Sequence, residues 1–437
     1  MRLLDLSIQN IGPFDEARLE FLSAHDDPVP VAIITGENGT GKTILLDAIR
    51  GLFGEYYGRL ERAIWRNGTP FQAEANLFID GQRERLLSKQ KQYSQGAFDF
   101  LPHHSKISRL PIDVEGGQQC PNWVVDFWRS SLPADAYTIS QLARPAPKSF
   151  LSNALKGIQR NAAVTELVCA FDYLRGSDDP RDRRDGEVLY ETIRRIVELS
   201  VLDGELSHVD RRAFMPMVRQ SGQLVPLSNL SSGNAYLIQH MIGLLGKMYA
   251  VHVLRETDAS ELCKTPGLLL IDEAENHLHP RWQKRFLGDV LSIFPNLQII
   301  ATTHSPFIVG SVPGARVFVC RYDRERKTCV VDDATDLYAN KPVEEILLSP
   351  AFDGTQPFGE EISRLLEERK AAFEAGDSVR RKEIEKQLKD KNPEYFSYID
   401  IEERLQSLRG EGECSRSSDC RRLMCSLEMK IAGAPHS

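Results

Sequence analysis

The residues most able to do chemistry are those of Gly36–Thr43, which follow the spacing G-x-x-x-x-G-K-T. Glycines at these positions let backbone N–H groups converge on phosphate oxygens, Lys42 adds a positive charge, and the Thr43 hydroxyl can ligate Mg²⁺. An apolar run at 31–34 precedes the loop, and residues 44–49 favour a helix whose positive end faces the same anion. The segment therefore predicts a nucleotide-phosphate site formed by Asn38, Gly39, Thr40, Gly41, Lys42 and Thr43.

A pair of acids, Asp272 and Glu273, follows the apolar run 268–271. Such a run predicts a buried parallel strand, and ligands of open α/β sheets bind at the carboxyl ends of their strands. In a P-loop enzyme the first acid holds Mg²⁺ and the second polarises the water that attacks the γ-phosphate. The alternative is a strand that ends in a solvated acidic turn, and the glycine loop upstream makes the catalytic interpretation the stronger one.

His304 follows another largely apolar stretch, Gln298–Ala301, and the threonines Thr302 and Thr303. A lone histidine is more often structural, but this one is placed to reach a γ-phosphate and to order the attacking water. We therefore predict Lys42, Glu273 and His304 as the catalytic residues.

A fourth segment, Leu230–Asn234, precedes an apolar helical pattern at 235–245. Ser231, Ser232 and Gly233 at a helix start can bind a phosphate through hydroxyl and N–H groups. Taken alone, an ordinary serine N-cap is the simpler interpretation.

In this order, the four segments resemble the nucleotide-binding domain of ABC-type ATPases. Leu230–Asn234 is similar to their Leu-Ser-Gly-Gly-Gln signature but differs at Ser232 and Asn234. The opening residues 1–14, the run Asp272–Pro280 and the run Thr303–Pro306 are typical of the SMC/RecF-type branch. Within it they resemble the short anti-phage group, which includes the Septu-type ATPase and the OLD-like ATPase domain without TOPRIM.

The resemblance implies an α/β fold: a P-loop ABC-type ATPase head with a helical insertion and a C-terminal helical extension. It implies an ATPase with ATP and Mg²⁺ as cofactors, the metal being held by Thr43, Asp272 and a glutamine. Gln141, after the β-like run 136–139, is the candidate, although the middle segment contains other glutamines. In this class Ser231, Ser232 and Gly233 serve a partner's nucleotide, so the chain is expected to pair with itself head to tail, as a dimer or higher oligomer.

Periodicity divides the chain into segments. Together with the resemblance, they imply an ATPase N-lobe at 1–147, a helical insertion at 148–219, an ATPase C-lobe at 220–339, a C-terminal helical region at 340–410 and a disordered tail at 411–437. Finer predictions are a hairpin with a glycine turn at Asn76–Arg83, loops over 91–135, and helices at Glu360–Lys370 and Val379–Lys389. The insertion lacks a sustained heptad run, which excludes the long coiled coil that SMC proteins carry there.

The composition agrees with a soluble enzyme, and we expect a cytoplasmic one. Of 437 residues, 41% are hydrophobic and 27% are charged. No apolar run reaches about 20 residues, so no membrane span is expected, and the N-terminus lacks a secretory pattern. The eight cysteines fit no common zinc spacing.

The net charge of −8 argues against a protein that coats nucleic acid. Arginines nevertheless gather in two stretches of the middle segment, interleaved with acids: Arg175, Arg181, Arg183, Arg184, Arg194, Arg195, Arg211, Arg212 and Arg219. A solvated helix face is the favoured interpretation, and direct DNA binding stays open.

Two classes of function remain. The resemblance favours a sensor or regulator ATPase of a prokaryotic anti-phage defence system, which controls a separate effector nuclease, as Septu-type ATPases work with a His-Asn-His nuclease. The alternative is an ABC ATPase of DNA repair or maintenance that acts on DNA directly. After His304 the sequence has neither a His-Asn-His pattern nor the Asp-x-Asp of a TOPRIM domain, so we expect the chain itself not to be a nuclease.

Overall fold

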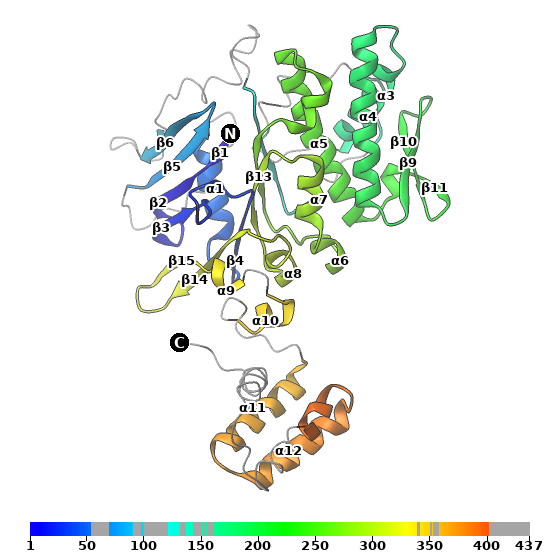
Figure 1. Cartoon of the computed structure of the whole chain (residues 1–437). Coiled ribbons are helices and arrows are strands. Elements are labelled where there is room, and N and C mark those ends of the chain that lie inside the picture. The colour runs from blue at the N-terminus through cyan, green and yellow to red at the C-terminus, as the bar shows by residue number, and fades with distance from the viewer. Residues whose placement is uncertain are drawn as a thin grey trace. The chain divides into compact units, whose positions relative to one another are not determined.

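The computed structural model describes residues 1–53, 70–90, 98–99, 121–131, 137–142, 151, 154, 161–338, 341–349, 352 and 358–401. The chain forms two compact units, Met1–Val343 and Glu344–Ser437 (Figure 1), and each has a hydrophobic core of its own.

The first unit is built on a mainly parallel sheet. Its strands are, in spatial order, β15 (Thr328–Asp333), β14 (Arg316–Asp323), β4 (Val31–Gly36), β13 (Leu297–Thr302), β12 (Gly267–Ile271) and β8 (Val124–Trp128). β15 alone runs antiparallel, to β14, and the other neighbours are parallel. The four strands from β4 to β8 are buried throughout, which explains their near-continuous apolar sequences. The glycine-loop strand β4 and the strand before His304, β13, are direct neighbours in this sheet.

An antiparallel sheet covers one face of this unit. Its strands are β3 (Phe14–Glu20), β2 (Asp5–Ile11), β5 (Gln72–Ile79), β6 (Gln82–Gln90) and β7 (Phe98–Asp99), with β1 (Arg2–Leu3) beside β5. The predicted hairpin is confirmed, because β5 and β6 pair around Asp80 and Gly81, whose φ angles are 50° and 80°. Helix α1 (Lys42–Leu52) packs between the two sheets.

Helices cover the other side of the main sheet (Figure 1). The longer ones are α3 (Asn161–Arg175), α4 (Pro180–Ser200), α5 (Ser232–Arg255) and α7 (Phe286–Ile293). The short ones are α6 (Pro280–Gln283), α8 (Pro306–Val309) and α9 (Thr335–Tyr338). Among the described helices, α5 is long and apolar enough to cross a membrane, yet 83% of its most apolar window is buried inside the protein, as in a core helix.

The insertion differs from its prediction. Helices α3 and α4 are present, but the end of the segment 148–219 forms strands of a small sheet with the order β11 (Gln223–Pro226), β10 (Met215–Gln220) and β9 (Gly204–Asp210). The strands are rich in polar residues, and among their leucines and valines only Leu206, Val209 and Val218 are buried. With so few apolar residues, the sequence shows no alternation of apolar and polar positions from which these strands could have been predicted.

The prediction of loops over 91–135 was wrong at the two-residue strand β7 and at the longer strand β8. This strand reads Val-Val-Asp-Phe-Trp, and all five residues are buried. Asp126 interrupts the apolar run, and its charge is balanced by Lys247 of α5 at 3.0 Å. Trp128 Nε1 also donates to its carboxylate at 3.0 Å. Because Lys247 is distant in sequence, the compensation that permits a buried acid was not visible from the strand itself.

The second unit confirms the predicted helical hairpin. Helices α11 (Glu360–Glu374) and α12 (Ser378–Lys391) are separated at Gly376, whose φ is 71°. The short helix α10 (Val343–Leu347) precedes them. Their core contains Leu365, Ala372, Ile384, Leu388, Phe396 and Ile399. The predicted tail at 411–437 lies outside the described residues.

Candidate ATP-binding site

The glycine loop between β4 and α1 has a backbone that only glycine permits at two positions. Gly36 has a φ of 138°, and a Cβ there would lie 2.0 Å from the carbonyl oxygen of Cys320. Gly41 has a φ of 95°, and its Cβ would lie 2.5 Å from the Phe14 ring. Gly41 is also the N-cap of α1 and offers no capping side chain. The first N–H groups of α1 are therefore left to an anion, as a phosphate site requires.

Lys42 is folded into this loop. Its ammonium donates to the carbonyl oxygens of Gly36, at 3.0 Å, and Glu37, at 2.7 Å. An ammonium group has three protons, so one donor remains for a phosphate oxygen. Burial lowers the pKa of Lys42, and the nearby acids, among them Asp272 and Glu273, oppose that effect. The Lys42 ammonium is thus held inside the loop, beside the predicted position of the phosphates, by two backbone carbonyl oxygens.

Asp272 lies at the carboxyl end of β12, directly beside α1. Thr43 Oγ1 donates to its Oδ1 at 3.0 Å, and Thr302 Oγ1 donates to the same oxygen at 2.7 Å. Burial raises the pKa of Asp272, and these two hydrogen bonds counteract the rise. The structure thus brings together two of the three residues predicted to hold the metal.

This donor set fits Mg²⁺ bound together with a nucleotide. Mg²⁺ is commonly held by one or two carboxylates, with phosphate oxygens and water completing its shell. Within the described residues, no group of three or more His, Cys, Asp or Glu side chains is placed to hold a metal. Thr43 contributes one hydroxyl and Asp272 one carboxylate. Such a pair suits a Mg²⁺ ion whose remaining ligands are phosphate oxygens and water.

Glu273 is held in an unusual backbone conformation, with a φ of 51°. For a residue with a side chain such a conformation costs about 1–3 kcal/mol, and it occurs preferentially at functional sites. The Glu273 N–H donates to Thr302 Oγ1 at 2.9 Å, and its Oε2 accepts from Asn276 Nδ2 at 2.6 Å. Asn276 therefore orients the carboxylate that we predicted as catalytic, a role that sequence reasoning missed.

His304 follows β13 and is half-buried. Burial lowers the pKa of the His304 imidazole, and the positive charge of Lys42 lowers it further. The acids Glu275, Glu273 and Asp272 oppose this shift, and Glu275 has the largest effect of the three. The Glu275 carboxylate also accepts the His304 backbone N–H at 2.7 Å. Glu275 was not predicted, although the spacing Asp-Glu-Ala-Glu in the sequence offered a signal.

The predicted signature segment begins α5. Ser231 is the N-cap, its Oγ accepts the Asn234 N–H at 3.4 Å, and both Ser231 and Ser232 are exposed. Gly233 packs so closely on the loop after β12 that a Cβ would lie 2.4 Å from the His277 carbonyl oxygen. The exposed hydroxyls are accessible to a second molecule, and their contact with a partner's nucleotide stays a prediction.

Gln141 lies in the described segment 137–142, which has no regular secondary structure, and is exposed. In the β-like run predicted before it, the described residues 137–139 do not form a strand. The strand that enters the sheet before Gln141 is β8, which pairs with β12. Metal ligation by Gln141 stays a prediction.

Both sheets, the glycine loop and the acids at the carboxyl edge define a P-loop ATPase head of the ABC type. Residues 31–310 match the family described as "AAA domain, putative AbiEii toxin, Type IV TA system", and the chain belongs to this family. This agrees with the ATPase domain that the sequence predicted, and the chain is similar to relatives named as a Septu protein and a retron ATPase.

Three known proteins show the range of the similarity. "Septu protein PtuA" of Bacillus thuringiensis is 23% identical over 309 residues, which cover 70% of this chain and 72% of that protein. "Retron Vc95 probable ATPase" of Vibrio cholerae serotype O1 biovar El Tor is 23% identical over 217 residues, or 49% of this chain and 40% of the relative. The solved SMC head domain from Thermotoga maritima is 16% identical with a TM-score of 0.43, and the match covers 76% of this chain and 99% of that one.

Proposed function

We propose that this chain is the cytoplasmic ATPase of a prokaryotic anti-phage defence system, and that its ATP state controls a separate effector nuclease. The observation that carries the ATPase assignment is the hydrogen-bonded group of Thr43, Asp272, Thr302 and Glu273 next to Lys42. Similarity to a Septu protein and a retron ATPase supports the defence role.

The residues divide the work of hydrolysis between them. The N–H groups of Asn38–Thr43 and the Lys42 ammonium bind the phosphates, and Thr43 and Asp272 would hold Mg²⁺, which neutralises phosphate charge when bound. Glu273, oriented by Asn276, accepts a proton from the attacking water, because its carboxylate keeps a second oxygen for that contact. His304 contacts the γ-phosphate. In this way the protein supplies positioning and fixed charge rather than covalent chemistry.

We further propose that two chains enclose two ATP molecules head to tail. Ser231 and Ser232 are exposed at the start of α5, and Gly233 contacts the loop that carries Glu273. A partner's γ-phosphate at this helix start would meet free N–H groups and two hydroxyls. Each signature segment would therefore complete the site of the other chain.

Ser231→Arg should leave ATP binding by one chain intact but block this dimer, because a long cation at the helix start displaces the partner's phosphate sterically. The measurement is light scattering with ATP in the Glu273→Gln background, with and without the second change. Ser228→Arg, at an exposed position before the signature, is the matched control. Equal dimer content with and without Ser231→Arg would exclude a role in trans for the signature.

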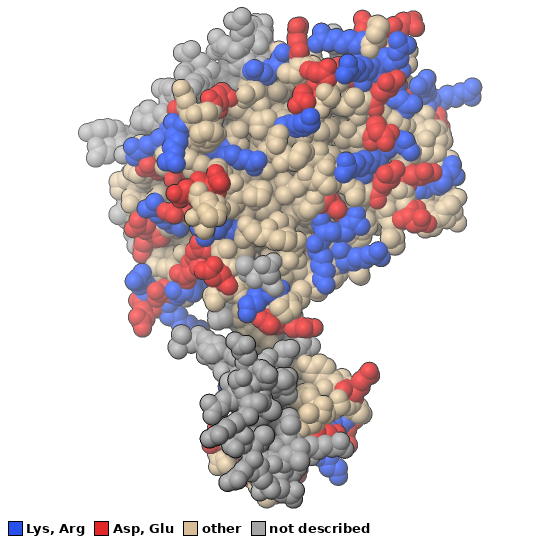
Figure 2. Space-filling view, in the orientation of Figure 1, with Lys and Arg blue, Asp and Glu red and all other residues tan. Residues whose placement is uncertain are grey.

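The arginines of the insertion do not favour the alternative of a DNA-maintenance ATPase. Figure 2 shows blue and red side chains interleaved on the visible face rather than separated. Of the clustered arginines, several form ion pairs with acids of the same unit: Arg175 and Arg211 with Asp172, Arg184 with Asp258, Arg194 with Glu191, and Arg219 with Glu205. Such pairing supports the solvated-surface interpretation, because a phosphate backbone attracts uncompensated positive charge.

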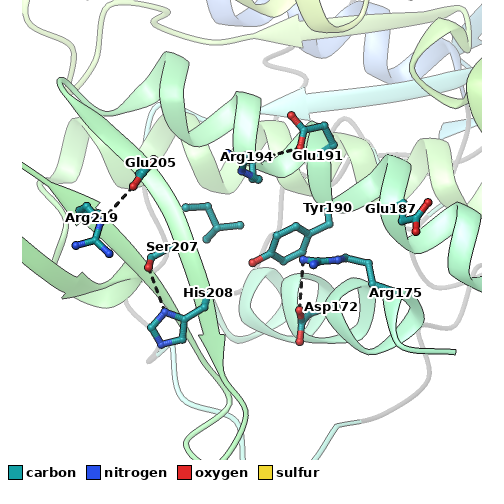
Figure 3. Close-up of a pocket in the computed structure, with 11 residues that line it drawn as sticks. Asp172, Arg175, Glu187, Tyr190, Glu191, Arg194, Glu205, Ser207, His208 and Arg219 are labelled. Atoms are coloured by element: carbon teal, nitrogen blue, oxygen red, sulfur yellow. Dashed lines mark hydrogen bonds and ion pairs between the residues drawn. The ribbon is translucent and has the colours of Figure 1, made fainter.

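The insertion offers a cavity of about 720 Å³ that is separate from the glycine loop and is lined by residues of α3, α4, β9 and β10 (Figure 3). Arg175 stacks on the Tyr190 ring at 3.9 Å. Glu205 and Arg219, which pair at 3.2 Å, form its opposite side. A mixed-charge hollow of this kind suits contact with another protein, and we propose the insertion and the region 340–410 as docking surfaces for the effector.

The purified chain should therefore not cut DNA, with Mg²⁺ or Mn²⁺ and with or without ATP. Asp272 and Glu273 are assigned to ATP, and Asp332 and Asp333 are engaged with Arg321 and Arg316. The measurement is gel analysis of plasmid and linear DNA. Metal-dependent cleavage that persists in a Lys42→Ala, Glu273→Gln double variant would contradict the proposal and show that the chain carries its own nuclease site.

A further inference from the structure

We infer that Glu275 is a positioning residue that sets the place of His304 at the γ-phosphate, through two hydrogen bonds to the turn after β13. This inference rests on the proposed ATPase mechanism and assigns a role to a residue of the run Asp272–Pro280 that this mechanism does not use.

Both carboxylate oxygens of Glu275 are used on this turn. Oε2 accepts from Thr303 Oγ1 at 2.6 Å, and Oε1 accepts from the His304 backbone N–H at 2.7 Å. Hydrogen bonds to an ionised carboxylate are about twice as strong as neutral ones, and two of them fix direction as well as distance. The carboxylate therefore determines where the His304 backbone lies relative to the acid loop.

The other side of the turn is fixed by the glycine-loop strand. The Thr303 N–H donates to the Ile34 carbonyl oxygen at 3.0 Å, and Thr303 is fully buried. Ile34 stands two residues before Gly36, where the phosphate loop starts. Thr303 and His304 are thus held between the strand that carries the phosphate loop and the loop that carries Glu273.

A second bridge runs parallel to the first. Gln283 Nε2 donates to the Leu278 carbonyl oxygen at 2.8 Å, and Gln283 Oε1 accepts from Ser305 Oγ at 2.6 Å. The turn 303–305 is therefore tied to the 273–283 segment at two points. Of the two, the Glu275 bridge touches the His304 backbone itself, whereas Gln283 acts one residue further along.

The His304 ring depends on this backbone support. The hydrogen bond found for His304 in the described part of the chain involves its main-chain N–H, and the imidazole is half-buried between charged neighbours. A ring without a partner of its own is aimed by its backbone, so a shift of the turn moves the imidazole directly. A displacement of about 1 Å can lower a rate by about 100-fold.

A double-mutant cycle separates positioning from general support of the fold. We expect Glu275→Ala to lower the kcat for ATP hydrolysis by about 10- to 100-fold, with a Kd for ATP near the wild-type value and a thermal unfolding transition that stays cooperative. In a His304→Ala background, Glu275→Ala should have no further effect, because the group that it positions is gone. Single-turnover phosphate release resolves the slow rates, and Glu261→Ala, an exposed glutamate paired with Lys264, is the matched control.

Two outcomes would overturn the inference: wild-type kcat in Glu275→Ala, or the same loss in the presence and absence of the His304 side chain. Thr303→Val and Thr303→Ser provide an independent pair if Glu275→Ala fails to fold. The valine removes the hydrogen bond that the Thr303 hydroxyl donates to Glu275 and the one that it accepts from the Ser305 N–H, and it should lower kcat. The serine keeps the hydroxyl and should restore kcat; equal rates in both variants would refute the bridge. Wild-type protein without ATPase activity would instead refute the proposed function.

Discussion

Lys42→Ala is expected to abolish measurable ATP binding. The ammonium lies inside the glycine loop and is held by the carbonyl oxygens of Gly36 and Glu37. Its removal takes away the charge that meets the phosphates and leaves those two carbonyl dipoles facing an anion. Loss of one partner from a desolvated charge pair costs about 2–5 kcal/mol, and about 3 kcal/mol raises Kd by more than 100-fold.

Isothermal titration calorimetry with ATP and Mg²⁺ measures this effect directly. Lys264→Ala is the matched control, because Lys264 is an exposed lysine of the same unit that pairs with Glu261. The control should keep the wild-type affinity, and both variants should melt as cooperatively as the wild type. ATP affinity within twofold of wild type in Lys42→Ala would show that the phosphates bind elsewhere.

The parts of the site and fold that could be predicted from the sequence are those that depend on residues close together in the chain. The segments that lead into Gly36, Asp272 and Thr302 are apolar because their strands are covered on both faces, and polar residues appear where each strand ends. The start of α5 at Ser231 and the turn at Gly376 follow equally local rules for capping and for positive φ.

The parts that could not be predicted depend on contacts between distant segments. Strand β8 contains Asp126, which is tolerated because Lys247 from α5 reaches it. Glu275 acquires its role because Thr303 and His304 lie beside it in space, and the residues around Glu275 in the sequence do not indicate that these two are its partners. Pairing of this kind is set by strand order, and strand order follows from how whole elements pack.

Glu273→Gln is expected to separate ATP binding from hydrolysis. The amide has nearly the shape of the carboxylate but cannot accept a proton from water, and a general base typically contributes 10²–10⁴-fold. The groups that bind the phosphates and the metal, Lys42, Thr43 and Asp272, are unchanged. We therefore expect a Kd for ATP close to that of the wild type and a rate of phosphate release lower by about 100-fold or more.

The same variant should accumulate in the closed, ATP-bound dimer, because the step that opens it is blocked. Light scattering with ATP should then show the doubled mass persisting for many wild-type turnover times, while the wild type returns to its starting state. Glu325→Gln, on the turn between β14 and β15, is the matched control and should behave as wild type.

Hydrolysis by Glu273→Gln at the wild-type rate would mean that Glu273 is not the base. Slow hydrolysis without a persistent dimer would keep Glu273 as the base and refute the head-to-tail pairing, so the two measurements together test the chemistry and the assembly separately.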